Sequence, residues 1–461
     1  MKKNLFLLAF LSLITNSAFS GGLLTNTNQS VHFLRNPARD ASTEMDAVYR
    51  NPAGLTYLTD GFHLSLSNQS VLQTRTITST FAPFAANGSS ATKTYEGETN
   101  SPIVPSVQFA YKKNAWVFSG EFAVVGGGGK ATFNHGLPSF ESQVSMIPIA
   151  LSLAGMPTTA YSMDCSMEGS SYIFGLQLNE SYQFSDAFSG AIGLRVNKVI
   201  NGYKGSLTNI QINPQHPLLN PSGNMISAPT FFTNAGMASY AAATTDKQID
   251  CTQSGWGFSP IVSLNYHVSG LNLSAKYEFK SSIEVENNTV VDYNNMYPDG
   301  AKTANDIPAL LTVGAAYDIS DKWTVSGGYH HFFDSDAKMA KNKQQYINGG
   351  INEYLFGSEY DINDKFLVSA GVQFTNTGVT DAYQSDMNYS LDSYSIGLGG
   401  AMNINSNLRL NVGYFFTIYS DWTKNTIATN ATNGYNGTPI NGKDVYGRTN
   451  NVFGIGLDYK F

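Results

Sequence analysis

Three basic residues on the polar faces of alternating segments could bind an anion. Arg195 lies between two apolar residues, and Lys276 and Lys280 flank Glu278 at every second position. A charge that leaves water needs a partner of opposite sign. Arg195, Lys276 and Lys280 are therefore candidates for binding the acidic head group of a ligand. For Arg195 we favour a carboxylate of the segment before the first strand, namely Asp40, Glu44 or Asp46.

Two cysteines, Cys165 and Cys251, lie in the two longest loops that we predict. An even pair in an exported protein indicates a disulfide, which would join these loops. Neither cysteine has a second Cys or a His at the spacing of a metal site, so we predict no metal.

Catalytic motifs are weak, and we predict neither an enzyme nor a cofactor. The glycines Gly126, Gly127, Gly128 and Gly129 do not form a phosphate loop, because Val124 stands where a Gly is required and Ala131 where a Ser or Thr is required.

The histidine pair is a second weak signal. His330 and His331 point to opposite faces of a strand, so we expect them in a girdle at the outer rim. The remaining enzyme alternative is a hydrolase that pairs His330 with Asp334 or Asp336.

The elements that position these residues are strands with a two-residue period. From Leu271 to Lys280 apolar and polar residues alternate strictly, and the pattern recurs in residues 323–329, 366–374 and 408–416. Such segments have one apolar and one polar face. A soluble sandwich would carry more charge on its polar face, since charged residues are only 13% of this chain and about 25% of a typical soluble one.

Short turns and long loops alternate along the chain. Six tight polar turns occur at residues 112–114, 185–186, 269–270, 321–322, 363–365 and 405–407, and seven longer polar loops separate them, including those at about 126–170 and 207–253. This arrangement predicts an antiparallel transmembrane β-barrel of fourteen strands over residues 61–461, with both chain ends on the periplasmic side.

The N-terminus indicates export. Lys2 and Lys3 precede an apolar run from Leu5 to Ile14, and small residues precede Gly21, so residues 1–20 form a signal peptide that we expect to be cleaved near Gly21. The apolar run is too short for a membrane helix, which needs about 20 residues. The net charge of −7 argues against nucleic acid as a partner.

Residues 21–60 remain outside the strand count and carry helix signals, so we predict that they form a short, partly helical hatch inside the barrel. They contain Arg-Asn-Pro-Ala twice, at 35–38 and 50–53. The run from Asp46 to Leu55 resembles the Asn-Pro-Ala hatch signature of the FadL family of outer-membrane transporters for long-chain fatty acids and other hydrophobic compounds. Residues 307–314 and 321–324 are similar to that family too. The first Asn-Pro-Ala departs from the pattern, and we interpret it as a chance recurrence of a turn.

The resemblance implies a mechanism and a location. A ligand such as a long-chain fatty acid would bind extracellular loops, enter an apolar pocket, and leave sideways through a wall gap beside the hatch. The motif Asn51, Pro52, Ala53 and Gly54 would gate this path by contacting the bent third strand, for which Gly126 to Gly129 are the candidate kink. The same glycines could equally be a flexible start of the loop at 126–170. The protein would be a monomer in the outer membrane of a Gram-negative cell, in contact with its lipid and with the assembly machinery that reads the terminal Phe461.

Loop composition agrees with ligand capture. The loops at 126–170 and 207–253 are rich in apolar residues and methionine, which adapt to varied apolar ligands; the same residues could instead pack together and close the barrel. The alternative functions are uptake of haem or another ligand, or a general porin, although a hatch of about forty residues speaks against an open pore.

Overall fold

The wall of the molecule is one closed antiparallel sheet. The structure, a computed structural model, describes residues 25–293 and 295–461. It confirms the predicted fourteen-stranded barrel. The uninterrupted strands are β1 (Gly61–Thr80), β2 (Thr92–Lys113), β3 (Trp116–Phe133), β4 (Tyr161–Gln183), β5 (Phe188–Ile212), β7 (Lys247–Val268), β12 (Trp323–Phe332), β13 (Ile351–Asn363), β14 (Phe366–Asn376), β15 (Ser393–Asn403) and β18 (Gly442–Lys460).

The other three strands of the wall are each broken into two segments. They are β8 (Leu271–Glu278) with β9 (Glu284–Val291), β10 (Lys302–Ala304) with β11 (Leu310–Ser320), and β16 (Leu408–Tyr419) with β17 (Trp422–Thr426). A two-residue segment, β6 (Ile226–Ser227), pairs with the end of β5. The barrel closes where β1 pairs with β18, from His63 opposite Lys460 to Thr80 opposite Lys443.

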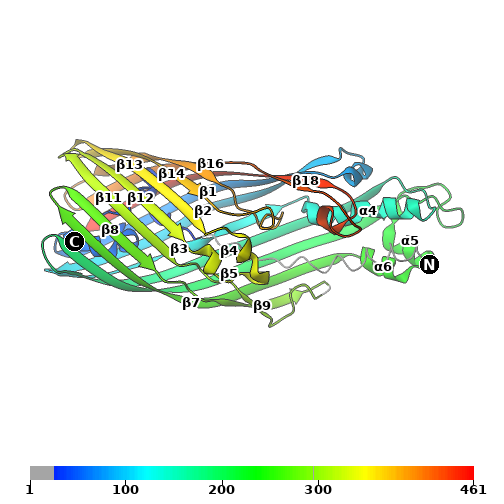
Figure 1. The fold of residues 1–461 in the computed structure, drawn as a ribbon, viewed down its shortest axis with the longest axis horizontal. Coiled ribbons are helices and arrows are strands. Elements are labelled where there is room, and N and C mark those ends of the chain that lie inside the picture. Colours follow the sequence, from blue (N-terminus) through cyan, green and yellow to red (C-terminus); the bar gives the residue numbers. More distant parts are fainter. Residues whose placement is uncertain (1–24, 294) are drawn as a thin grey trace.

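All six predicted turns join neighbouring strands at one rim, where the C-terminus also lies (Figure 1). The long connections lie at the opposite rim with most of the helices. Two predicted loops are too long: β3 continues to Phe133 and β4 begins at Tyr161, while β5 continues to Ile212 and β7 begins at Lys247. Beyond the apolar belt the outward residues of β4, β5 and β7 are polar or charged, such as Glu168, Lys204 and Asp250. The apolar residues there, such as Met167, Tyr203 and Ile249, face inward, so the alternation changes sides although pairing continues.

The outer surface carries an apolar belt. Outward residues of neighbouring strands are large and exposed, for example Phe118 (50%), Ile192 (66%), Phe258 (58%), Phe356 (57%) and Ile455 (54%). Exposed apolar surface of this extent is typical of a membrane-facing wall. No helix in the described part of the chain is long and apolar enough to cross a membrane.

The residues before β1 fill the barrel at its turn-bearing end. This segment, Thr25 to Asp60, is called the hatch below and contains α2 (Val31–Arg35), α3 (Ala47–Arg50) and the 3-10 helix η2 (Pro52–Tyr57). Helix α2 contacts β14, β15, β16, β18 and β1, whereas η2 contacts β2, β3, β4, β5 and β7. The hatch thus touches the wall on opposite sides, and most of its side chains are buried.

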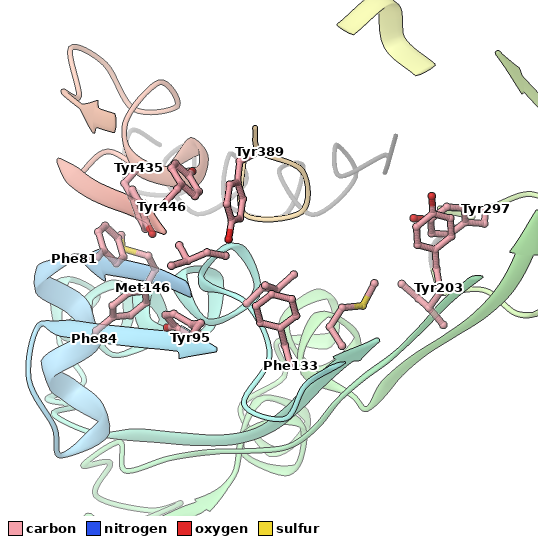
Figure 2. Packing of buried hydrophobic residues seen from close by; sticks show 14 of the residues in the cluster. Phe81, Phe84, Tyr95, Phe133, Met146, Tyr203, Tyr297, Tyr389, Tyr435 and Tyr446 are labelled. Carbon is pink, nitrogen blue, oxygen red and sulfur yellow. The ribbon is translucent and has the colours of Figure 1, made fainter. Parts of the chain in front are cut away.

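The long connections fold over the other end and are called the cap below. They contain α4 (Pro138–Leu153), α5 (Ala228–Asn234), α6 (Ala238–Thr244), and the 3-10 helices η3 (Ala82–Asn87), η4 (Asp334–Asp336), η5 (Ala340–Tyr346) and η6 (Tyr435–Gly437). Their aromatic side chains pack together: Figure 2 shows Phe81, Phe84 and Tyr435 in one group and Tyr203 stacked on Tyr297 in another. The apolar loop residues therefore do pack on one another.

Candidate functional site

The second Asn-Pro-Ala of the hatch is bonded to three strands of the wall. Asn51 Nδ2 donates to Asn265 Oδ1 (2.6 Å) and to Ser42 O (3.0 Å), and its Oδ1 accepts from Ser263 Oγ (3.3 Å). Ser181 Oγ donates to Pro52 O at 2.8 Å, and Ser189 Oγ to Ala53 O at 2.7 Å. The motif is thus bonded to β4, β5 and β7.

Gly54 leaves the space that the Asn51 side chain occupies. A Cβ on Gly54 would lie 2.4 Å from Asn51 Nδ2 and 2.6 Å from Ser42 O. Any larger residue would displace the side chain from its partners in the wall. A glycine is therefore required three residues after Asn51, because the Asn51 side-chain amide folds back over that position.

The first Asn-Pro-Ala lies against the opposite wall in an equivalent position. Asn36 ends α2 as Asn51 ends α3. Its Oδ1 accepts from Ala38 N (3.1 Å), and a Cβ on Gly357 of β13 would lie 1.9 Å from that oxygen. Both copies therefore turn the chain at the end of a short helix beside the wall. The first copy thus has the same structural role as the second and is more than a chance recurrence of a turn.

Ion pairs join the hatch to the wall below α2. Arg39 pairs with Asp46 (2.8 Å) and with Glu359 of β13 (2.8 Å), and Arg409 of β16 pairs with Glu44 (2.7 Å). His32, Glu44 and Asp46 offer ligand atoms within 4.8 Å of one another. Because arginines already occupy both carboxylates, this group suits hatch attachment better than a cation.

The predicted head-group cations are also paired. Arg195 pairs with Glu278, which also binds Lys276 (2.7 Å). The expectation that a hatch carboxylate would pair with Arg195 is wrong, because Glu278 on β8 faces the same interior at closer reach. Lys276 Nζ also donates to Tyr49 O of the hatch (2.7 Å). Lys280 lies in the break after β8, where Nζ donates to Asp336 O (3.1 Å).

The backbone pairing between β2 and β3 is interrupted, and this interruption is called the gap below. The two strands pair at Val107 and Phe122 and again at Glu98 and Thr132, but not between. On β3 the pairing with β4 is irregular from Val124 to Gly129. Gly127 adopts φ +95° and Gly129 φ +71°, conformations that L-residues rarely adopt.

Two prolines on β2 help to explain the gap. Pro102 and Pro105 have no N–H to donate to a neighbouring strand, so Pro is normally confined to sheet edges. A proline pair on one strand beside a glycine run on the next was the signal in the sequence.

The hatch contact to the bent strand comes from Asn26. Asn26 N donates to Val125 O (2.8 Å) and Asn26 Nδ2 to Val124 O (3.0 Å), and Thr25 forms a bridge with Gly126. The expectation that Asn51 makes this contact is wrong, because Asn51 lies against β7. The N-terminal end of the hatch therefore covers the backbone of β3 where its pairing is irregular.

A cavity of about 340 Å³ lies within the cap. It is lined by α4, α6 and the outer ends of β4, β5 and β7, with apolar side chains that include Val144, Ile147, Leu151, Phe232, Met237 and Tyr240. A buried hydrogen-bond group holds α4 in place: Glu141 binds Lys93, Tyr95 OH (2.6 Å) and Tyr161 OH (2.7 Å).

The chemistry of Glu141 is set by this group. Burial by itself would raise the pKa of Glu141, but the hydrogen bonds from Lys93, Tyr95 and Tyr161 lower it below its ordinary value. Glu141 is therefore ionised at neutral pH and ties α4 to β2 and β4.

No family model and no curated protein matches this sequence. Solved structures do share its architecture. A FadL homologue from Pseudomonas aeruginosa superposes with a TM-score of 0.64 at 12% identity, over 95% of this chain and 100% of that one. The chain has the FadL fold. The toluene transporters TodX of Pseudomonas putida (TM-score 0.54) and TbuX of Ralstonia pickettii (0.52) share 15% identity with it, over 91% of this chain and 94% of theirs.

Identities this low establish the FadL fold alone, and they confirm the resemblance drawn from residues 46–55 at that level. TodX and TbuX are named as toluene transporters. Within the FadL fold, the candidate functional features of this chain are the gap, the hatch contacts and the cap cavity.

The predicted disulfide does not form in this version of the FadL fold, since both cysteines are free. Cys165 on β4 is opposite Leu207 of β5, whereas Cys251 on β7 is opposite Tyr203. The two are thus separated by one whole strand and by four residues along it. That separation exceeds the roughly 7 Å Cα distance that a disulfide can bridge.

The histidines are also placed differently from the expectation. His330 is fully buried between Asp40 of the hatch (2.8 Å) and Glu353 of β13 (2.7 Å), so it is not at the rim. Asp334 accepts from Ile351 N instead. The arrangement needed for a His–Asp hydrolase pair is therefore not formed by these residues.

Proposed function

We propose that the protein carries hydrophobic small molecules, with long-chain fatty acids as one class, across the outer membrane and releases them sideways into the bilayer. The proposal depends above all on the gap between β2 and β3. In a barrel whose lumen is filled by a hatch, two strand segments that are not paired with each other can separate and give an apolar solute a sideways route. Burying each methylene is worth about 0.8 kcal/mol, so an apolar solute gains by avoiding water.

Entry would begin at the cap cavity. Its lining of aliphatic, aromatic and methionine side chains suits an apolar ligand. Exposed apolar side chains at the outer loops, Leu153 (70%) and Leu218 (87%), would give a first contact for such a solute.

Exit would follow the gap. The last pair before it, Val107 with Phe122, has both side chains exposed on the apolar belt, and Ile103 beside the gap is 74% exposed. The free backbone of β3 is covered on its inner side by Thr25 and Asn26. Unpaired backbone at membrane depth is tolerated where protein covers it, so moving this short segment would open the path.

In this mechanism the motif from Asn51 to Gly54 holds the hatch still while its N-terminal end moves. The motif has its bonds to β4, β5 and β7, whereas Thr25 and Asn26 contact the bent part of β3. The glycines Gly126 to Gly129 supply the bend. Arg195 and Lys276, already bound to Glu278, would serve the hatch and its attachment.

The test is a variant whose gap is closed. Replacing Pro102 and Pro105 with Thr restores two N–H donors, and deleting Gly127 and Gly128 removes the two extra residues that β3 carries against β4. Pro260→Thr, a proline in the paired part of β7, is the matched control. We expect uptake of radiolabelled oleate by cells to fall at least tenfold in the closed variant and to stay normal in the control. Normal uptake by a correctly assembled closed variant would refute lateral release.

Conductance separates this proposal from the porin alternative. The hatch fills the lumen and is held by ion pairs and hydrogen bonds to the wall. We expect planar bilayers with the purified protein to show no large steady current. A large open-pore current would favour a porin instead.

A further inference from the structure

Two arginines face each other on the inner wall at the closing seam of the barrel. Arg75 of β1 is directly opposite Arg448 of β18 in the sheet register. They alternate with the outward residues of these strands and lie in phase with the buried inward residues Gln73, Ile77 and Tyr446. Both guanidinium groups therefore enter the lumen.

Neither arginine has a carboxylate partner among the residues that the structure describes. Arg75 Nε reaches only Gln73 Oε1, at 3.5 Å, and Arg448 Nε is buried without a hydrogen bond. The groups lie instead near aromatic rings, with Arg75 5.9 Å from the centre of Tyr389 and Arg448 5.1 Å from that of Tyr419.

The other arginines of the lumen are different. Arg35, Arg39, Arg195 and Arg409 each pair with at least one glutamate. Asp444, the carboxylate on the same face of β18 towards the cap, already accepts from Ser79 and Tyr435. The Arg75–Arg448 pair is thus set apart by its lack of a counter-charge.

A pair of like charges directly opposite in a sheet is destabilising. The repulsion grows inside a protein, where screening by water is reduced. An anion placed between the two guanidinium groups would reverse this effect, because each can donate two parallel hydrogen bonds to a carboxylate. The pair is therefore complementary to a negatively charged group that the chain itself does not supply.

Apolar surface begins close to the pair. Val71 and Val452, four residues nearer the hatch on the same two strands, pack with Phe33 and Phe415. On the other side Arg75 is opposite Gly97 of β2, and β2 loses β3 as a partner two residues later, at Thr99. If the acidic end of a ligand bound the arginines, its tail could contact the apolar wall around Val71 and Val452 and the edge of the gap at Thr99.

We propose that Arg75 and Arg448 bind the carboxylate of an amphiphilic ligand that has one acidic end and one aliphatic tail. This inference rests on the proposed function and assigns it a ligand class. Neutral hydrocarbons would pass through the same lumen without using the pair.

The test compares a charged and a neutral probe with the same tail. Dansylaminoundecanoate and its methyl ester are titrated into the purified, detergent-solubilised protein, its Arg75→Gln and Arg448→Gln forms, and the double variant. Lys204→Gln, which removes an exposed cation (69% exposed side chain), is the matched control.

We expect the double variant to bind the carboxylate probe about 10- to 100-fold more weakly, the range given by loss of charge-assisted hydrogen bonds, and to bind the ester as the parent does. Removing the repulsion should leave the melting temperature unchanged or raise it. Equal weakening of both probes, or a lower melting temperature, would mean a structural role and overturn the proposal.

Three further outcomes separate the possibilities. Unchanged carboxylate binding in the double variant would overturn the arginine site while leaving hydrophobic transport intact. Failure of the parent protein to bind either probe would overturn the proposed function itself. Displacement of the carboxylate probe by inorganic phosphate or acetate at equal concentration would overturn the amphiphile assignment and indicate a site for small inorganic anions.

Discussion

The two Asn-Pro-Ala copies provide an internal comparison for the strength of hatch attachment. Asn51→Ala removes three buried hydrogen bonds, to Ser42, Ser263 and Asn265. Asn36→Ala removes one local bond to Ala38 and one longer bond to Ser326 Oγ, at 3.4 Å. A buried hydrogen bond contributes about 1 kcal/mol, so we expect Asn51→Ala to lower the free energy of hatch opening by about 2–3 kcal/mol and Asn36→Ala by about 1 kcal/mol.

Hydrogen exchange measures this difference directly. The expected loss raises the open population about 30- to 150-fold for Asn51→Ala and about fivefold for Asn36→Ala. The assay is exchange mass spectrometry on a peptide covering residues 47–58, with a peptide from β16 as the internal control. Barrel amides should exchange as before, since the substitution lies within the hatch. Equal effects of the two substitutions, or none, would refute the assignment of Asn51 as the stronger attachment.

Three other predictions follow from the contacts of the wall and the cap. Gly357→Ala should loosen the hatch by about 1–3 kcal/mol through overpacking against Asn36, seen as faster exchange of α2, while Gly169→Ala, which meets nothing within 4 Å, should not. The lowered pKa of Glu141 stabilises α4 above the unfolded pKa of about 4.3, and this stabilisation should vanish as pH falls through the lower folded pKa. The protection factors of residues 138–153, which correct for the intrinsic pH dependence of amide exchange, should therefore fall in acid in the parent but depend little on pH in Glu141→Gln. Protection factors that do not change with pH in the parent would contradict this. Cys165 and Cys251 should both be alkylated in unfolded protein without reductant, and protection of both thiols would contradict the free state.

The wall could be predicted from the sequence because lipid imposes a strict period on it. Every second residue from Leu271 to Phe279 faces outward. The six polar turns are short enough to join only neighbouring antiparallel strands, so they fix the order of the strands. Where that constraint ends, prediction failed: β3 continues beyond the belt through the run Gly126 to Gly129, and in β4 the apolar residues, such as Met167, face inward while polar residues, such as Glu168, face outward.

The site was predicted less well because its contacts join residues far apart in the chain. Glu278 and Arg195 are 83 positions apart, and no local pattern favours Glu278 over Asp40 as the partner. Asn26 contacts Val124 across 98 positions. The gap did leave a local signal, in the prolines of β2 and the glycines of β3. That signal indicates a gap only when the two strands are considered as neighbours.

The position of the hatch has a consequence for how the barrel is built. The chain leaves the hatch directly into β1, and β1 forms the seam with β18. Wall glycines such as Gly413 and Gly454 lie so close to α2 that a Cβ would be 2.7 Å and 2.4 Å from Leu34 atoms. A finished barrel would leave no room for the hatch to thread in, so the hatch must already lie among the strands when the first and last of them meet. The strands would then assemble around the hatch, and pairing of β1 with β18 would be the last step in closing the barrel.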